Sequence, residues 1–327
     1  MRTAHLPLAL IFICCALSPA RAEAASDWQQ KLQQDIPQRL LQMDLPFRVD
    51  YTAEVREELS GYLRSGKRST EYMLGRSSMY FPIFDYYLEA YRLPKALKYI
   101  PLLESRLQPD IESGAGAAGL WQFMPATGRG FGLHIDEWVD ERKNPYRSTD
   151  AAMRYLSQLY KQFDDWSLAL AAYNCGPGRV RKAIKASGCD NFWDIEHLLP
   201  RQTRRYLPRI IATIYVAEHY DIHGLTPVYK PSQQQNFSVF RIHQEIDLSA
   251  IAQHCNISEE RLLNWNPGYN ELYAPAPPTG KPYYLILPQR ALPSFQTYII
   301  KESRKTGENY AVAVLESQIK HVDLGRS

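Results

Sequence analysis

Glu104 is an acidic residue among apolar neighbours, directly before the glycine-rich segment 113–125. In a helix of 100° per residue it falls on the same arc as Leu97, Ile100 and Leu107. A carboxylate on an inward-facing stripe is costly unless it is paired or protonated, and burial raises its pKa towards the range of a general acid. The position alone leaves two interpretations open: a catalytic acid, or a structural carboxylate satisfied by a buried partner.

The composition excludes several other kinds of chemistry. The 327 residues, 45% hydrophobic and 22% charged, predict a folded protein of two domains, or of one domain with an attached module. A formal charge of +3 gives no reason to expect nucleic acid as a partner. The sequence has no zinc-ligand spacing and no Gly-x-Ser-x-Gly motif, so we expect no metal, no cofactor and no serine-hydrolase site.

The elements that must position Glu104 are helical. Residues 25–93 contain mostly good helix formers and predict an N-terminal helical extension, and residues 94–224 predict an all-α domain. In that domain we expect five helices. They begin at Pro94 (with a kink at Pro101), at residues 148–150, at Trp166 after an Asp cap, at Pro177 and at Pro208.

The N-terminus predicts export. Residues 1–24 combine a basic Arg2, an apolar run from Leu6 to Leu17 and small residues at a cleavage pattern, which together indicate a signal peptide. The run is shorter than the roughly 20 residues of a membrane-spanning helix, although an uncleaved anchor stays an alternative. Cys14 and Cys15 make a poor lipid-attachment site, so we expect an exported, periplasmic protein without a lipid anchor, at most loosely associated with the cell envelope. The oligomeric state is left open.

The C-terminal part predicts a small separate module. Residues 225–236 contain two prolines and a glutamine run, as linkers do. The pattern of residues 237–290 then predicts a strand, two helices and a second strand. No function is predicted for the tail 291–327. The remaining cysteines, Cys175, Cys189 and Cys255, are expected to be free thiols.

Four blocks together resemble the soluble lytic transglycosylase and goose-type lysozyme superfamily. They are residues 103–105, 116–127, 172–180 and 199–208. The resemblance implies a mainly α protein with a lysozyme-like domain, acting on the glycan strands of peptidoglycan. The module 237–290 resembles a LysM domain, a βααβ unit that binds peptidoglycan, except that residues 245–248 replace its usual Gly-Asp-Thr-Leu turn.

The resemblance also implies a role for individual side chains. Glu104 matches the single catalytic glutamate, and six residues match substrate-contacting positions: Ser105, Gln122, Met124, Tyr173, Asn174 and Tyr206. Ser105 is alternatively a solvated serine, Met124 a core residue, and Tyr206 a core tyrosine. The matched blocks supply no second carboxylate, whereas most glycosidases use two. The resemblance therefore implies cleavage by one acid/base to 1,6-anhydro-N-acetylmuramic acid ends. Hydrolysis by the same fold, and a non-catalytic peptidoglycan-binding protein, stay as alternatives.

Overall fold

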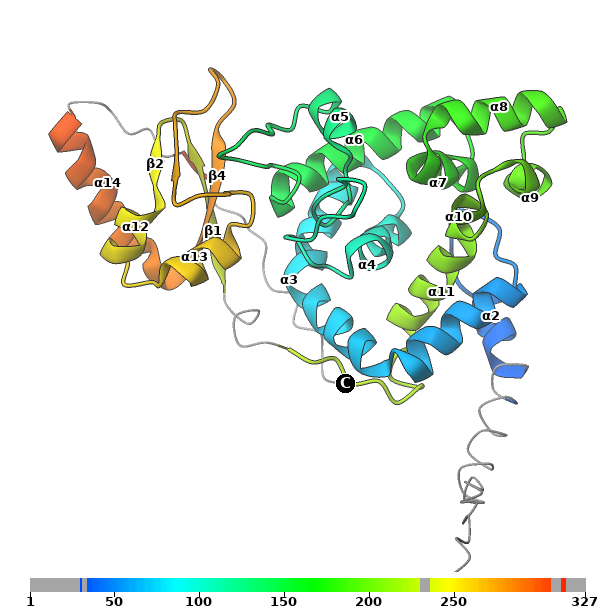
Figure 1. The fold of residues 1–327 in the computed structure, drawn as a ribbon. Coiled ribbons are helices and arrows are strands. Elements are labelled where there is room, and N and C mark those ends of the chain that lie inside the picture. The colour runs from blue at the N-terminus through cyan, green and yellow to red at the C-terminus, as the bar shows by residue number, and fades with distance from the viewer. Residues whose placement is uncertain (1–29, 31–33, 230–235, 307–312, 316–327) are drawn as a thin grey trace, which may run out of the picture. The chain divides into compact units, whose positions relative to one another are not determined.

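The computed structural model describes residue 30 and residues 34–229, 236–306 and 313–315 (Figure 1). The chain divides into two units, Met1–Asp44 and Leu45–Ser327. The predicted signal peptide lies outside the described residues. Across the described part, no helix combines the length and the apolar character needed to span a bilayer.

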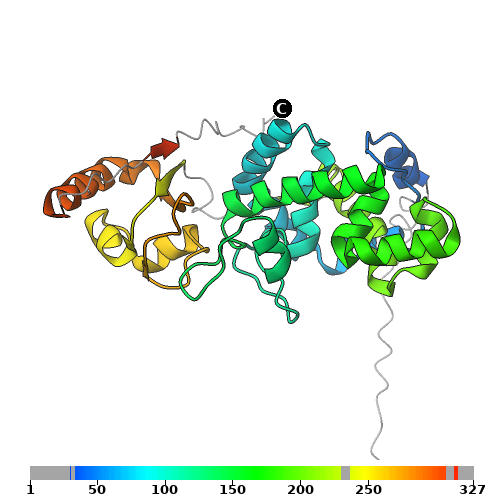
Figure 2. The ribbon, with the colours of Figure 1, turned by 90° about the horizontal axis from the view of Figure 1, so that it is seen from above.

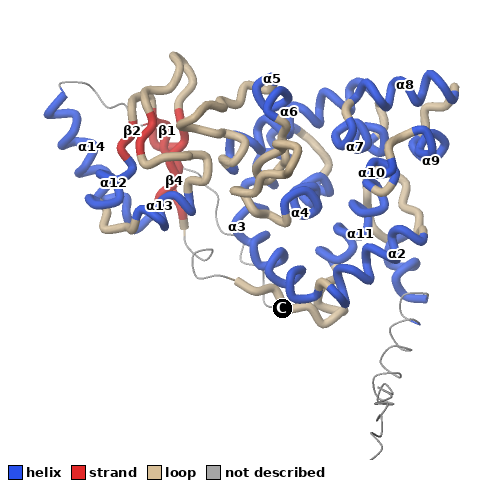
Figure 3. The backbone as a smooth tube through the Cα atoms, in the orientation of Figure 1, coloured by secondary structure: helices blue, strands red, loops and turns tan. Residues whose placement is uncertain are grey.

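The first part of the larger unit is built from helices, drawn in blue in Figure 3. The α-helices are α2 (Ala53–Ser60), α3 (Lys67–Tyr91), α4 (Ile100–Ser105), α5 (Pro125–Gly130), α6 (Pro145–Phe163), α7 (Trp166–Cys175), α8 (Pro177–Ser187), α9 (Phe192–Ile195), α10 (Arg201–Arg204) and α11 (Tyr206–Glu218). Shorter turns of other helix types are η1 (Gly61–Ser65), η2 (Lys95–Tyr99) and η3 (Glu196–Leu198). The prediction of a mainly α fold is confirmed.

Two of the five predicted helix starts are confirmed. Helix α7 begins after Asp165, whose side chain accepts a hydrogen bond from the Leu168 amide at 2.7 Å. Helix α8 has Pro177 in its first turn and ends before Gly188, which adopts the left-handed conformation at φ 73°.

The other three predicted starts were wrong, because proline and capping residues act differently from the prediction. Pro101 lies in the first turn of α4, so it starts this helix and does not kink it. Asn144 caps α6 by accepting from two backbone amides, so the helix begins at Pro145, three residues earlier than predicted. Pro208 lies in the first turn of α11, where no amide is needed, so Tyr206 is the first helical residue.

The short helix α4 is held by longer ones. It packs against α11 and η2, while α3 packs against α6, and α6 against α7 (Figures 1 and 2). Leu97, Ile100 and Leu107 are buried as the helical arc predicted, with exposures of 1% or less. These apolar contacts hold α4, and with it Glu104, in one orientation.

The module after the linker has the predicted order of elements. Strand β1 (Phe237–Ile242) pairs antiparallel with β4 (Tyr283–Pro288), and β2 (Ile246–Asp247) pairs with β3 (Tyr273–Ala274). Helices α12 (Leu248–His254) and α13 (Glu259–Trp265) lie between them in the chain. Strand β5 (Ala313–Leu315) adds to β1 on its other side.

Two segments for which the sequence predicted no packing, the C-terminal tail and the start of the linker, contact the rest of the fold. Helix α14 (Leu292–Thr306), which follows the short turn η5 (Gln289–Ala291), places Phe295 in the module core at 1% exposure. The start of the predicted linker lies along α3, where the Val228 amide donates to the Glu71 carbonyl at 2.9 Å. Residues 230–235 of that linker are outside the described residues. The three described cysteines, Cys175, Cys189 and Cys255, are free thiols.

Candidate active site

Glu104 lies near the end of α4 and lines a cleft of about 480 Å³. Arg106 and Leu107 directly after it adopt left-handed conformations at φ 51° and 57°, which end the helix and turn the chain away. The carboxyl group is half-buried and surrounded by enough protein that burial raises its pKa above the ordinary value. A volume of this size suits a small-molecule or oligosaccharide subsite.

Tyr206 holds the carboxyl group of Glu104. Its hydroxyl donates to Glu104 Oε1 at 2.5 Å, and the side chain is only 2% exposed. Burial raises the pKa of Glu104, whereas this hydrogen bond, and then the Arg209 guanidinium, act to lower it. Burial and the nearby carboxylate raise the pKa of Tyr206 well above its usual value, so the tyrosine stays a proton donor in the hydrogen bond.

Ser105 does not line the cleft. Its side chain is 2% exposed, and its hydroxyl bonds the carbonyl oxygens of Pro101 and Leu120, each at 2.9 Å. Both the predicted contact with substrate and the alternative of a solvated serine are therefore wrong for Ser105. The hydroxyl joins α4 to the glycine-rich segment, so it fixes the distance between Glu104 and the opposite wall.

Residues 113–124, here named the active-site loop, form that wall. Ala118 and Phe123 exchange backbone hydrogen bonds at 3.1 Å, which closes the loop on itself. Gly119 adopts φ +83°, and a Cβ there would lie 1.9 Å from the Arg142 carbonyl oxygen. Only glycine fits at this position. Gln122 also has a positive φ of 49°; it lines the cleft, and its Nε2 donates to the Gly119 carbonyl at 3.0 Å.

Tyr173 and Asn174 reach the cleft from the end of α7. The Tyr173 hydroxyl donates to the Trp121 carbonyl at 2.7 Å, which ties α7 to the active-site loop. Asn174 Oδ1 accepts from Thr203 Oγ1 at 2.9 Å, which leaves its amide donor for a ligand. Both side chains are half-buried.

The structure thus brings five of the seven predicted residues to the cleft lining, namely Glu104, Gln122, Met124, Tyr173 and Asn174. Met124 is 43% exposed, so it belongs to the cleft wall and not to the core. Tyr206 lies behind the acid and Ser105 beside it. Sequence reasoning missed part of the lining, including Phe123, Thr127, Tyr155, Cys175, Arg179 and Gln202. All of these except Tyr155 stand inside the four recognised blocks, which was a usable signal. Tyr155 had none, because it belongs to the apolar stripe of α6.

The cleft lining contains a single acidic residue. Among the described residues that line it, Glu104 is the one carboxylate. Within the same described ranges, no group of three or more His, Cys, Asp or Glu side chains is arranged to hold a metal ion. Proton transfer by one half-buried acid, beside amide, hydroxyl and aromatic groups, is the chemistry that this arrangement can perform.

Comparison with known proteins agrees with this arrangement. Residues 82–195 match the family model described as "Transglycosylase SLT domain". This part of the chain is therefore similar to an SLT domain. Residues 236–299 match "Lytic transglycosylase MltD, LysM-like domain", a range that includes part of α14. The resemblance predicted from the four sequence blocks, and that of the C-terminal module to LysM, are both confirmed.

The chain is also similar to individual proteins. The chain is 30% identical over 276 residues to membrane-bound lytic murein transglycosylase D of Escherichia coli K12, covering 82% of this chain and 58% of that protein. It is 29% identical over 141 residues to soluble lytic murein transglycosylase of the same strain, covering 41% of this chain and 22% of that protein. The chain therefore spans a little more than half the length of the first of these relatives.

Solved structures overlap with the chain only partly. The crystal structure of the 70 kDa soluble lytic transglycosylase of Escherichia coli aligns with a TM-score of 0.40 at 18% identity, covering 65% of this chain and 45% of that one. At this level the alignment adds nothing to the fold assignment, which rests on the SLT match and on the helices themselves.

Proposed function

We propose that this protein is a peptidoglycan lytic transglycosylase that cleaves the β-1,4 bond between N-acetylmuramic acid and N-acetylglucosamine. The observation that carries the proposal is the lone half-buried carboxyl group of Glu104, held by Tyr206 in a cleft of the SLT domain. The names of the relatives, murein transglycosylases, support the same substrate.

One acid/base suffices when the substrate supplies the other groups. Protonated Glu104 gives its proton to the glycosidic oxygen as the bond to C1 of the muramic acid breaks. The N-acetyl group of that sugar stabilises the developing positive charge. Glu104, now a carboxylate, takes the proton of the sugar's own C6 hydroxyl as that oxygen attacks C1. The product ends in 1,6-anhydro-N-acetylmuramic acid, no water is consumed, and the acid regains its proton.

The other lining residues bind and orient the strand in this proposal. Gln122 and Asn174 offer an acceptor and a donor to N-acetyl or hydroxyl groups. Met124 offers an exposed apolar surface to a sugar face. Ser105 ties α4 to the loop through the Leu120 carbonyl, and Tyr173 ties α7 to it through the Trp121 carbonyl.

The test is digestion of purified peptidoglycan followed by mass spectrometry of the released muropeptides. Anhydro ends are one water lighter than reducing ends. We expect anhydro ends from the wild type and loss of soluble product from Glu104→Gln, which keeps shape but removes the titratable proton. Reducing ends alone would assign hydrolysis. Equal release by the variant would show that Glu104 is not the catalytic acid, and no release by either protein would make it a non-catalytic binder.

We also propose that the protein works in the periplasm, where its substrate lies. Support comes from the predicted signal peptide and from the name of the relative, a membrane-bound murein transglycosylase.

In the LysM-like domain, residues 245–248 replace the usual Gly-Asp-Thr-Leu turn and make contacts of their own. Asp247 caps α12 by accepting a hydrogen bond from the Ala250 amide at 2.9 Å, and the Tyr273 hydroxyl donates one to the Glu245 carboxylate. These residues have structural partners within the domain.

A further inference from the structure

The two ends of the active-site loop are packed differently. Leu120, Trp121 and Phe123 are buried, at 2% exposure or less, whereas residues 113–117 are serine, glycine and alanine. Small residues bury little apolar area and leave the backbone free to adopt several conformations. The segment 113–117, which contributes Ser113, Ala115 and Ala117 to the cleft lining, therefore depends on polar groups outside the loop to hold its backbone.

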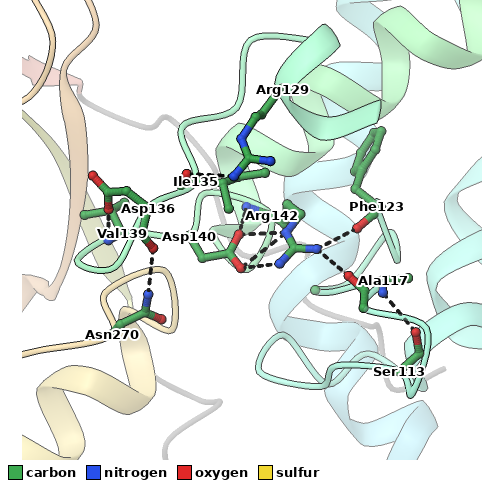
Figure 4. A network of polar contacts seen from close by, with 12 residues as sticks. Ser113, Ala117, Phe123, Arg129, Ile135, Asp136, Val139, Asp140, Arg142 and Asn270 are labelled. Carbon is green, nitrogen blue, oxygen red and sulfur yellow. Dashed lines mark hydrogen bonds and ion pairs between the residues drawn. The ribbon is translucent and has the colours of Figure 1, made fainter. Parts of the chain in front are cut away.

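Arg142 supplies such groups. Its Nη1 donates to the Gly116 carbonyl at 2.6 Å and to the Phe123 carbonyl at 3.1 Å, one on each side of the loop (Figure 4). Its backbone carbonyl lies against Gly119, the position at which no side chain fits. Arg142 thus contacts the loop at three points, although it does not line the cleft.

The guanidinium is itself fixed by a buried carboxylate. Asp140 accepts from Arg142 Nε at 2.9 Å and from Nη2 at 2.7 Å, and the two residues are 5% and 4% exposed. A buried, two-point pair of this kind has a set geometry, because the planar guanidinium fits the two carboxylate oxygens. The direction in which Arg142 presents Nη1 to the loop therefore follows from the position of Asp140.

The LysM-like domain holds the segment that carries Asp140. The Asp140 amide donates to the Gly268 carbonyl at 2.8 Å, and the Asn270 amide donates to the Trp138 carbonyl at 2.9 Å. Asn270 Nδ2 also donates to the Glu137 carbonyl at 3.2 Å, in the region drawn at the left of Figure 4. Val139 belongs to the apolar core of the LysM-like domain. The contacts run from the turn 268–270, through residues 137–140, to Arg142.

We propose that Arg142 is a positioning residue for the active-site loop, and that the LysM-like domain acts on the cleft by holding the segment 137–140 that fixes it. This role rests on the proposed function and adds to it a task for the domain other than binding the wall. The loop carries Gln122 and Met124, so loosening it weakens binding of the strand and leaves the proton chemistry of Glu104 unchanged.

The experiment compares kcat and KM of the full chain on soluble, uncross-linked glycan strands. Arg142→Lys keeps the charge near Asp140 but has a single nitrogen, which cannot bind both oxygens of Asp140 and both loop carbonyls at once. We expect its KM to rise about ten-fold, the effect of losing roughly one charge-assisted hydrogen bond. The pH at which kcat/KM falls on the basic side should be the same as in the wild type, because the protonation of Glu104 is unchanged. Hydrogen exchange at the Ala118 and Phe123 amides should become faster.

Arg154→Lys is the matched control. Arg154 also bonds a carboxylate, Asp150, and one backbone carbonyl, that of Phe131, but neither belongs to the active-site loop. Its KM should stay within about two-fold of the wild type, because no hydrogen bond to the loop is lost. Asn270→Ala tests the contribution of the domain, and its KM should rise in the same direction as that of Arg142→Lys, by a smaller factor.

A wild-type KM in folded Arg142→Lys overturns the positioning role. If that variant lacks a cooperative unfolding transition, Asn270→Ala decides in its place, since Asn270 is exposed and the change removes only its Nδ2 hydrogen bonds to the Asp136 and Glu137 carbonyls. A wild-type KM there overturns the role of the domain. These failures differ from failure of the proposed function, which would show as full activity of Glu104→Gln.

Discussion

The hydrogen bond between Tyr206 and Glu104 determines the pH range in which the proposed acid is protonated. The Tyr206 hydroxyl donates to Glu104 Oε1 at 2.5 Å and so favours the charged carboxylate, although burial raises the pKa overall. Tyr206→Phe removes this donor and keeps the buried ring. The pKa of Glu104 should therefore rise further.

The size of the change follows from the hydrogen bond. A bond to a charged acceptor contributes about 1.5–3 kcal/mol and one to a neutral acceptor about 0.5–1.5 kcal/mol. The difference of about 1–1.5 kcal/mol corresponds to about one pH unit, at 1.36 kcal/mol each. A general acid loses activity when it ionises, so kcat/KM of the variant should persist to a pH about one unit higher on the basic side.

The assay is the pH profile of kcat/KM on soluble glycan strands, which reports ionisations of the free enzyme. Tyr173→Phe is the control, because the Tyr173 hydroxyl donates to the Trp121 carbonyl and not to Glu104. Its basic limb should stay at the wild-type pH, whatever its KM. A limb of Tyr206→Phe that stays in place, or moves to lower pH, would refute the assignment of that limb to Glu104.

Three further outcomes follow from the same contacts. Glu104→Gln should stabilise the fold at neutral pH and not at acid pH. A carboxyl group whose pKa is raised by folding stabilises the folded state below its unfolded pKa, about 4.3. This contribution is lost as the pH rises through the folded pKa, so replacing the acid removes a cost only at higher pH. Thermal unfolding at several pH values measures this, and a pH-independent difference contradicts it. Gly119→Ala should cost more than about 2 kcal/mol in denaturant unfolding, because of its positive φ and the carbonyl 1.9 Å from the new Cβ. Gly114→Ala, with open space around it, is the control and should change stability by less than about 0.5 kcal/mol. Thr149→Val should cost about 1–3 kcal/mol, because it leaves the buried Trp121 Nε1 without its acceptor at 2.9 Å; a stability equal to the wild type would show that another acceptor replaces it.

Local sequence was enough for features that depend on neighbouring residues. The helix α7 with its Asp165 cap, the end of α8 at Gly188, and the strand–helix–helix–strand order of the module were all predicted. Helix caps and left-handed turns involve residues only a few positions apart, so the ends of these helices can be predicted from the sequence. Predicted helix boundaries were wrong where two nearby segments could each cap the helix. Asn144 and residues 148–150 both offer capping side chains for α6, and the structure uses Asn144.

The sequence by itself determined that one acid, Glu104, stands on an apolar helical stripe before a glycine-rich segment, within blocks typical of an SLT domain. Only the tertiary structure decided which groups surround that acid. Tyr206 is 102 residues away in the chain, and its bond to Glu104 exists because α11 packs against α4. Periodicity gives the direction of a side chain relative to its own helix, whereas partners depend on how helices pack. For the same reason Ser105 proved buried, and Arg142 could be recognised as a contact of the active-site loop only in the folded chain.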